Sequence, residues 1–143
     1  MRKHFIFIIL FFNICLSYSR NYTELQEWRG KALPSQIKNG VVVEVYDLKK
    51  LENDSIGVNI RLHNLSTKTL DEVVIKLWMW KKDGVWVDEV TLLEKDGSLG
   101  SIISGREYFF PRKGSYYTVK GIKYGEITKI QIEISRVVSK RAR

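Results

Sequence analysis

Apolar and polar residues alternate along most of the chain after residue 40, with the period of two that is typical of β-strands. Within 57–65, Val58, Ile60 and Leu62 are separated by polar residues, so one face of this strand is apolar. Residues 72–81 alternate in the same way but carry large side chains on both faces, which indicates a central strand. The pattern predicts about seven strands, which cover residues 41–48, 57–65, 72–81, 85–94, 106–110, 115–120 and 127–138.

Tight turns separate these strands, and no long helical segment lies between them. Asp83-Gly84 is a hairpin signal that returns the chain antiparallel, and Asp96-Gly97 opens a longer loop. This arrangement predicts an all-β fold, an immunoglobulin-like antiparallel β-sandwich, and a small closed barrel is the alternative. Trp78 is the first candidate for the large aromatic that such sandwiches often bury centrally, and Trp80 is the second.

The first nineteen residues have the composition of a signal peptide. Arg2 and Lys3 precede an apolar run over 5–16, and Ser17 and Ser19 supply the small residues of a cleavage site. The run is shorter than the roughly 20 apolar residues that cross a membrane, so we expect cleavage after Ser19 and no stable membrane anchor. An uncleaved anchor is the alternative.

Cleavage would leave 124 residues without a cysteine, because the one cysteine of the chain is Cys15. Ile14 precedes this cysteine where a lipidation site has a small residue, so we expect no lipid anchor. A domain of this size can fold on its hydrophobic core without disulfides. The formal net charge of the whole chain is +8, and the part after residue 19 stays basic.

Residues 20–40 are expected to form a short helix and a connector. Thr23 is followed by acidic residues and Gln26, which predicts a capped helix that ends at Gly30, and Pro34 lies in the connector. The expected organisation is a signal peptide over 1–19, the helix and connector over 20–40, a β-sandwich domain over 41–138 and a basic tail over 139–143.

One stretch of the expected sandwich carries a family resemblance. A polar turn leads into an alternating strand and then into Asp83-Gly84, and a later turn leads into another strand; the matching residues are Asn64, Ser66, Lys68, Thr69, Leu70, Val73, Ile75, Leu77, Ile103, Gly105, Glu107 and Phe109. About half of the chain after residue 19 thereby resembles the bacterial extracytoplasmic FxLYD-type domains, an immunoglobulin-like family. Trp80 and Lys81 stand where the family has its Tyr-Asp pair. The resemblance implies an exported immunoglobulin-like module of a bacterium, with no catalytic residues to transfer.

The sequence provides few residues for catalysis. His63 is the one histidine after residue 19, and it falls on the polar face of its strand, so neither a catalytic triad nor a zinc site is expected. Asp88 and Glu89 are neighbours in a strand and should point to opposite faces. Glu44, Glu107 and other acids could meet across strands, which leaves a small hydrolase of an anionic substrate as the alternative. No cofactor motif is present.

Two groups of residues are candidates for binding. Lys76, Trp78 and Trp80 share one strand face and Trp86 lies on the next strand, so they could bind a glycan or an anionic polymer. The alternative is that two of these tryptophans fill the core. The basic tail could contact an acidic surface, or could be a solvated terminus; its residues are Arg136, Lys140, Arg141 and Arg143.

These observations predict an exported, periplasmic or secreted, non-enzymatic module that binds a protein or an anionic polymer. Nucleic acid is not an expected partner of an exported protein. A structural subunit that pairs through an edge strand is a further alternative. Asn21, Asn53 and Asn64 begin glycosylation sequons, each in an expected loop or turn.

Overall fold

The computed structural model describes residues 22–24, 33–92 and 101–141. These residues form an all-β fold, with short 3₁₀ turns at Glu52–Asp54 and Tyr124–Glu126. The strands are β1 (Tyr22–Glu24), β2 (Ser35–Lys38), β3 (Val41–Lys50), β4 (Ile56–Asn64), β5 (Leu70–Lys81), β6 (Gly84–Thr91), β7 (Glu107–Phe110), β8 (Tyr117–Val119) and β9 (Lys129–Ser139).

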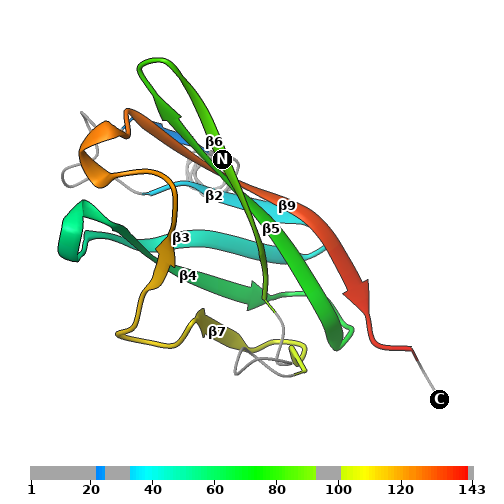
Figure 1. Cartoon of the computed structure of the whole chain (residues 1–143). Coiled ribbons are helices and arrows are strands. Elements are labelled where there is room, and N and C mark those ends of the chain that lie inside the picture. The colour runs from blue at the N-terminus through cyan, green and yellow to red at the C-terminus, as the bar shows by residue number, and fades with distance from the viewer. Residues whose placement is uncertain (1–21, 25–32, 93–100, 142–143) are drawn as a thin grey trace, which may run out of the picture.

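The strands are arranged in two antiparallel sheets that pack face to face (Figure 1). The four-stranded sheet has the order β1-β9-β5-β6, and the five-stranded sheet has the order β2-β3-β4-β7. Strand β8 also belongs to the five-stranded sheet, because it pairs with the first part of β4 while β7 pairs with the second part. The all-β class and the antiparallel sheets expected from the sequence are therefore confirmed.

The core lies between the two sheets and consists of aliphatic side chains at alternate positions. In β4, Ile60 and Leu62 are fully buried, and in β5 so are Leu77 and Met79. The same alternation buries Ile130, Ile132 and Ile134 of β9. Full burial of each such side chain contributes on the order of 1.5–3 kcal/mol to folding before its entropy cost. The core positions indicated by the alternation in β4 and β9 are thus confirmed, whereas in β5, with large side chains on both faces, the structure selects the face of Leu77 and Met79.

The tryptophans of β5 are not in this core. Trp78 and Trp80 are only partly buried, while Met79 between them is fully buried. Successive side chains of a strand point to opposite faces, so both tryptophans lie on the outer face of the four-stranded sheet. The expectation that Trp78 or Trp80 is the central buried aromatic is therefore wrong.

The segment before β3 differs from the expected helix and connector. Tyr22–Glu24 pair with β9 as strand β1, so Thr23 is not a helix cap, and the rest of the expected helix lies outside the described residues. Ser35–Lys38 form strand β2, which is joined to β3 through Asn39-Gly40. Both turn residues have positive φ angles of 51° and 76°, which asparagine and glycine tolerate and a two-residue hairpin requires. The described residues accordingly contain nine strands rather than about seven.

Buried asparagines connect β4 to neighbouring loops. The amide nitrogen of Asn59 donates to the carbonyl oxygens of Arg112 and Ser115 at 2.9 and 2.7 Å, which fixes the connection between β7 and β8. Asn64 is fully buried and its amide nitrogen donates to two carbonyl oxygens. A glycan could not attach to Asn64 in the folded protein, although Asn53 is exposed.

No helix in the described part of the chain is long and apolar enough to cross a membrane.

Candidate functional site

A surface that we name the tryptophan face lies on the outer side of β5 and β6, at the edge of the four-stranded sheet. It consists of Lys76, Trp78, Trp80, Val85 and Val87. The antiparallel register places Trp78 opposite Val87 and Trp80 opposite Val85. Residues directly opposite each other share a face of the sheet, so the two valines adjoin the two indoles.

The two indoles of this face lie nearly parallel. The ring centroids of Trp78 and Trp80 are 6.2 Å apart, and the ring planes differ by 24°. The indole nitrogen of Trp78 donates a hydrogen bond of 2.9 Å to Glu133 of β9, and the ammonium of Lys129 lies 4.3 Å from the centre of the Trp80 ring. Strand β9 therefore holds both rings in place through a hydrogen bond and a cation–π contact.

The valines of the tryptophan face reach the surface at an open strand edge. Val85 is 46% exposed and Val87 is 40% exposed. Strand β6 pairs with β5 on one side and with no strand on the other side among the described residues. The face thus combines apolar side chains with backbone groups that can pair with another strand.

The charges on this face nearly balance. Lys76 lies between two carboxylates in the register, with Glu89 opposite it on β6 and Glu133 opposite it on β9. Opposite charges across neighbouring strands attract each other, so the positive charge of Lys76 is locally compensated.

Trp86 is not part of the tryptophan face. It pairs with Met79 and so projects from the core side of the sheet, where it is 39% exposed. A Cβ atom at Gly121 would lie 2.6 Å from the Trp86 indole, so the ring packs against this glycine. Residue type alone had placed Trp86 with Trp78 and Trp80 as a candidate for binding. The two-residue turn over 82–83, which pairs Trp80 with Val85, was the signal that could have separated them.

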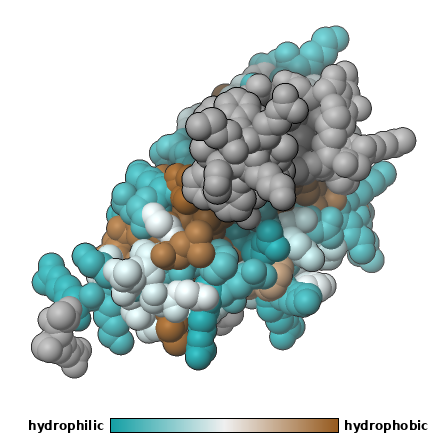
Figure 2. All heavy atoms as spheres, turned by 180° about the vertical axis from the view of Figure 1, so that it is seen from behind, coloured by the Kyte–Doolittle hydropathy of each residue, from teal (hydrophilic) through white to brown (hydrophobic). Residues whose placement is uncertain are grey.

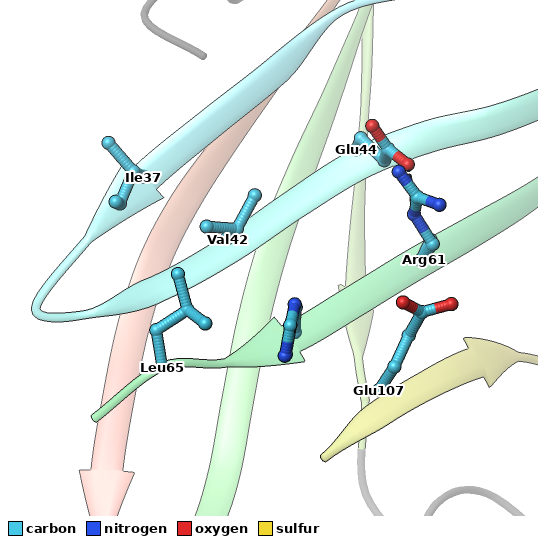
Figure 3. Close-up of a pocket in the computed structure, with 7 residues that line it drawn as sticks. Ile37, Val42, Glu44, Arg61, Leu65 and Glu107 are labelled. Atoms are coloured by element: carbon cyan, nitrogen blue, oxygen red, sulfur yellow. Dashed lines mark ion pairs between the residues drawn. The ribbon is translucent and has the colours of Figure 1, made fainter. Parts of the chain in front are cut away.

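The five-stranded sheet carries a second surface, which we name the acidic groove (Figure 3). It is a cavity of about 370 Å³ on the outer face of the sheet, and its walls are Ile37, Val42, Glu44, Arg61, His63, Leu65 and Glu107. Glu44 forms an ion pair with Arg61, which stands opposite it in the register. Glu107 stands opposite His63 and has no ion-pair partner among the described residues.

Aromatic side chains extend the outer face of the five-stranded sheet beyond the groove. A β-bulge at Tyr46 leaves this residue 48% exposed, with its ring 5.0 Å from that of Phe109 in an edge-to-face contact. Arg61 lies 5.5 Å from the Tyr46 ring, and Lys113 lies 5.7 Å from the Phe109 ring. This cluster could not be predicted from the sequence pattern, because its members come from segments that are distant in sequence.

The two adjacent acids of β6 that were considered for catalysis are separated by the fold. Asp88 and Glu89 point to opposite faces, as expected for neighbours in a strand. Asp88 accepts a hydrogen bond of 2.9 Å from the Tyr117 hydroxyl, which links β6 to β8 across the rim of the sandwich. Burial of the phenol, together with this hydrogen bond and the nearby negative charge, raises the pKa of Tyr117 to about 12.

A second tyrosine–carboxylate pair lies on the outer face of the five-stranded sheet, away from the acidic groove. The Tyr116 hydroxyl donates to Asp47, and this hydrogen bond, with burial and the negative charge of the carboxylate, raises the pKa of Tyr116. Lys49 lies 5.4 Å from the ring centre of Tyr116.

Within the described ranges, no three His, Asp or Glu side chains gather as a metal site requires.

The expected basic tail is partly integrated in the fold. Arg136 belongs to β9 and forms an ion pair of 2.7 Å with Glu72. The backbone nitrogen of Lys140 donates to the carbonyl oxygen of Thr69. Arg141 is exposed, and Arg143 lies outside the described residues. The four basic residues are therefore not brought together as one site.

Comparison with known proteins identifies a similar fold. The chain is similar to the Salmonella enterica trimeric lipoprotein SadB, with a TM-score of 0.54 and 12% sequence identity, over 97% of this chain and 74% of that one. At this identity the likeness shows the fold alone. No protein-family model matches the sequence, and no curated protein matches it either.

The two surfaces therefore differ in how far the sequence could reveal them. Lys76, Trp78 and Trp80 were expected on one strand face, and the structure places them there. The acidic groove joins residues of β2, β3, β4 and β7 that only the strand order brings together. Of its members, Glu44 and Glu107 had been noted as acids that could meet across strands, and His63 had been placed on the polar face of its strand.

Proposed function

We propose that this protein is an exported, non-enzymatic interaction module that pairs with a protein through the tryptophan face and the β6 edge. The observation that carries this proposal is the exposure of Val85 and Val87 beside two stacked tryptophans. Tryptophan and aliphatic groups that reach the surface together are typical of protein interfaces, because a partner removes their apolar surface from water.

The partner that this edge fits first is a second copy of the chain. An unpaired strand edge accepts another strand through backbone hydrogen bonds, which gives affinity without requiring a particular sequence. Two copies joined through β6 would extend the four-stranded sheet and bring their exposed valines next to each other. The structural neighbour is described as trimeric, which supports self-association as the form to test first.

Export is part of the proposal. The signal-like composition of residues 1–19 supports it, and the structural neighbour is described as a lipoprotein. The two packed antiparallel sheets agree with an immunoglobulin-like module, and the FxLYD resemblance stays a prediction. N-terminal sequencing of the exported protein should find Arg20 as the first residue; a retained N-terminus would contradict the proposed cleavage.

An anionic polymer is a weaker candidate for the same face. Lys129 over the Trp80 ring favours it, but Glu89 and Glu133 lie on either side of Lys76 and repel anions. The lysines at the end of β5 and just before the 3₁₀ turn Tyr124–Glu126 line a separate cavity, which Asp54 and Glu126 also line. Neither surface concentrates positive charge, so a protein partner fits better than an anionic polymer.

The hydrolase alternative required a pocket with converging carboxylates. The acidic groove contains two, but Glu44 is already paired with Arg61. A glycosidase-type mechanism needs two carboxyl groups that are both free to act, and Glu107 alone does not provide them. For a non-enzymatic module, we expect that neither the wild type nor His63→Ala hydrolyses anionic substrates.

The decisive experiment is sedimentation velocity of the purified protein from low to high micromolar concentration. The wild type should associate as the concentration rises. Val85→Lys and Val87→Lys should shift the protein toward the monomer, because an exposed lysine on an edge strand opposes pairing. A monomer at every concentration would refute self-association through β6.

Val138→Lys is the matched control. Val138 is also an exposed valine of the four-stranded sheet, at 36%, but it lies opposite Glu72 at the far end of β5. This variant should associate like the wild type. Equal weakening by all three lysine variants would assign the effect to net charge instead of the tryptophan face.

A further inference from the structure

The acidic groove has two chemically different ends, and Figure 3 shows how they are arranged. Ile37, Val42 and Leu65 form an apolar end, while Glu44, Arg61 and Glu107 cluster at the other end. Strands β2, β3, β4 and β7 each contribute a wall residue, so paired strands hold the outline of the groove.

The polar end of the groove is locally negative in a basic protein. Two carboxylates and the imidazole of His63, which stands opposite Glu107, surround one guanidinium; with histidine counted as neutral this end has a charge of −1, whereas the whole chain has a formal net charge of +8. Because Arg61 already pairs with Glu44, the carboxylate of Glu107 remains without a cationic partner among the described side chains. The groove therefore attracts a cation to Glu107.

The apolar end of the groove indicates that a ligand with a cationic group for Glu107 also carries an apolar group. Ile37 is 49% exposed and Leu65 is 55% exposed, and Val42 forms the buried floor between them. Small-molecule sites usually enclose most of their ligand. These two half-exposed side chains would not enclose a small ligand, and much of their apolar surface would stay in contact with water. A polypeptide laid across the sheet would instead cover both walls. The view of Figure 2 shows hydrophobic side chains reaching the surface among hydrophilic ones on the back of the molecule.

We infer that the acidic groove is a docking site for a segment of a partner polypeptide that carries a lysine or arginine beside an aliphatic residue. The cationic group pairs with Glu107, and the aliphatic side chain packs between Ile37 and Leu65. The ion pair of Glu44 with Arg61 stays intact and forms the back wall. This site lies on the opposite sheet from the tryptophan face and does not depend on the function proposed there.

The test is a titration followed by NMR of the His63 imidazole and of the isoleucine and leucine methyl groups. The probe is a blocked leucine-lysine-leucine tripeptide, and the comparison probes are leucine-glutamine-leucine and free hexylamine. The lysine peptide should shift the signals of His63, Ile37 and Leu65 and should bind more tightly than either comparison probe. Equal binding of the glutamine peptide would overturn the role of charge. Equal binding of hexylamine would overturn a polypeptide as the ligand.

Two variants complete the test. Glu107→Gln should weaken binding of the lysine peptide about threefold or more, since it removes the carboxylate that meets the cation. The matched control, Glu89→Gln, makes the same charge change on the other sheet and should bind like the wild type. Glu107 is exposed and has no ion-pair partner among the residues that the structure describes, so its replacement should leave the fold unchanged. Unchanged binding in Glu107→Gln, or no shift of any groove signal, would refute the proposal.

Discussion

Asn64 at the end of β4 offers a quantitative test of how the loops are held to the sandwich. Its amide nitrogen donates to the carbonyl oxygens of Lys68 at 2.8 Å and Ile102 at 3.0 Å. Its amide oxygen accepts from the backbone nitrogen of Ser66 at 3.1 Å and from the Ser66 hydroxyl at 2.6 Å. One fully buried side chain thus connects the turn after β4 to the segment around residue 102.

Asn64→Ala should remove all four of these hydrogen bonds. A hydrogen bond contributes a net of about 1 kcal/mol on average, and the partly exposed Ser66 hydroxyl can recover its bond from water. The carbonyl oxygen of Ile102 keeps its bond from the backbone nitrogen of Leu70, so it is not left without a partner. We therefore expect the free energy of unfolding to fall by about 3 kcal/mol, which is a large part of the about 5–15 kcal/mol typical of a domain.

Urea unfolding monitored by tryptophan fluorescence measures this loss. The midpoint should fall while the dependence of the free energy on urea stays constant, because the folded state keeps its compactness. Ser66→Ala is the graded control, since it removes only the hydroxyl and should cost about 1 kcal/mol or less. If Asn64→Ala lowers the free energy of unfolding no more than Ser66→Ala does, the buried amide does not hold the turn after β4 to the segment around residue 102.

Two further predictions concern stability. Gly121→Ala should destabilise the folded protein more than Gly114→Ala. Both glycines have positive φ angles, of 90° and 83°, but only at Gly121 would the new Cβ meet the Trp86 indole. Thermal unfolding of the two variants compares their stabilities. The raised pKa of Tyr117 stabilises the fold fully below pH 10, and this contribution is lost as the pH rises toward 12. Tyr117→Phe should flatten this dependence in unfolding measured at alkaline pH, and an unchanged dependence would contradict the raised pKa of the buried Tyr117 phenol.

Some elements of the fold could be predicted from local sequence. The alternation in β4 and β9 identified their core faces, and the Asp-Gly signal identified the β5–β6 hairpin, but the large side chains on both faces of β5 left its core face open. Strand β2 was missed, although Asn39-Gly40 is a strong two-residue hairpin signal, because Pro34 and Gly40 were interpreted as marks of a connector. Strand β1 had no such signal, since only its pairing with β9 defines it.

The candidate surfaces could be predicted only where they lie on one strand. Trp78 and Trp80 are two residues apart, so the period of the strand alone puts them on one face. The position of Trp86 depends on the register across the hairpin, and a shift of one residue moves a side chain to the other face of the sheet. The groove depends on the order of four strands, which local patterns do not encode.

The sequence by itself therefore determined the all-β class, the polarity of each long strand and the aliphatic core, because these follow from the backbone period of two and from the transfer of apolar side chains out of water. Only the tertiary structure decided which strands are neighbours, which tryptophans share a face and which acids meet an arginine. These features arise from pairings between residues far apart in the chain, and their energies depend on contacts that no local pattern contains.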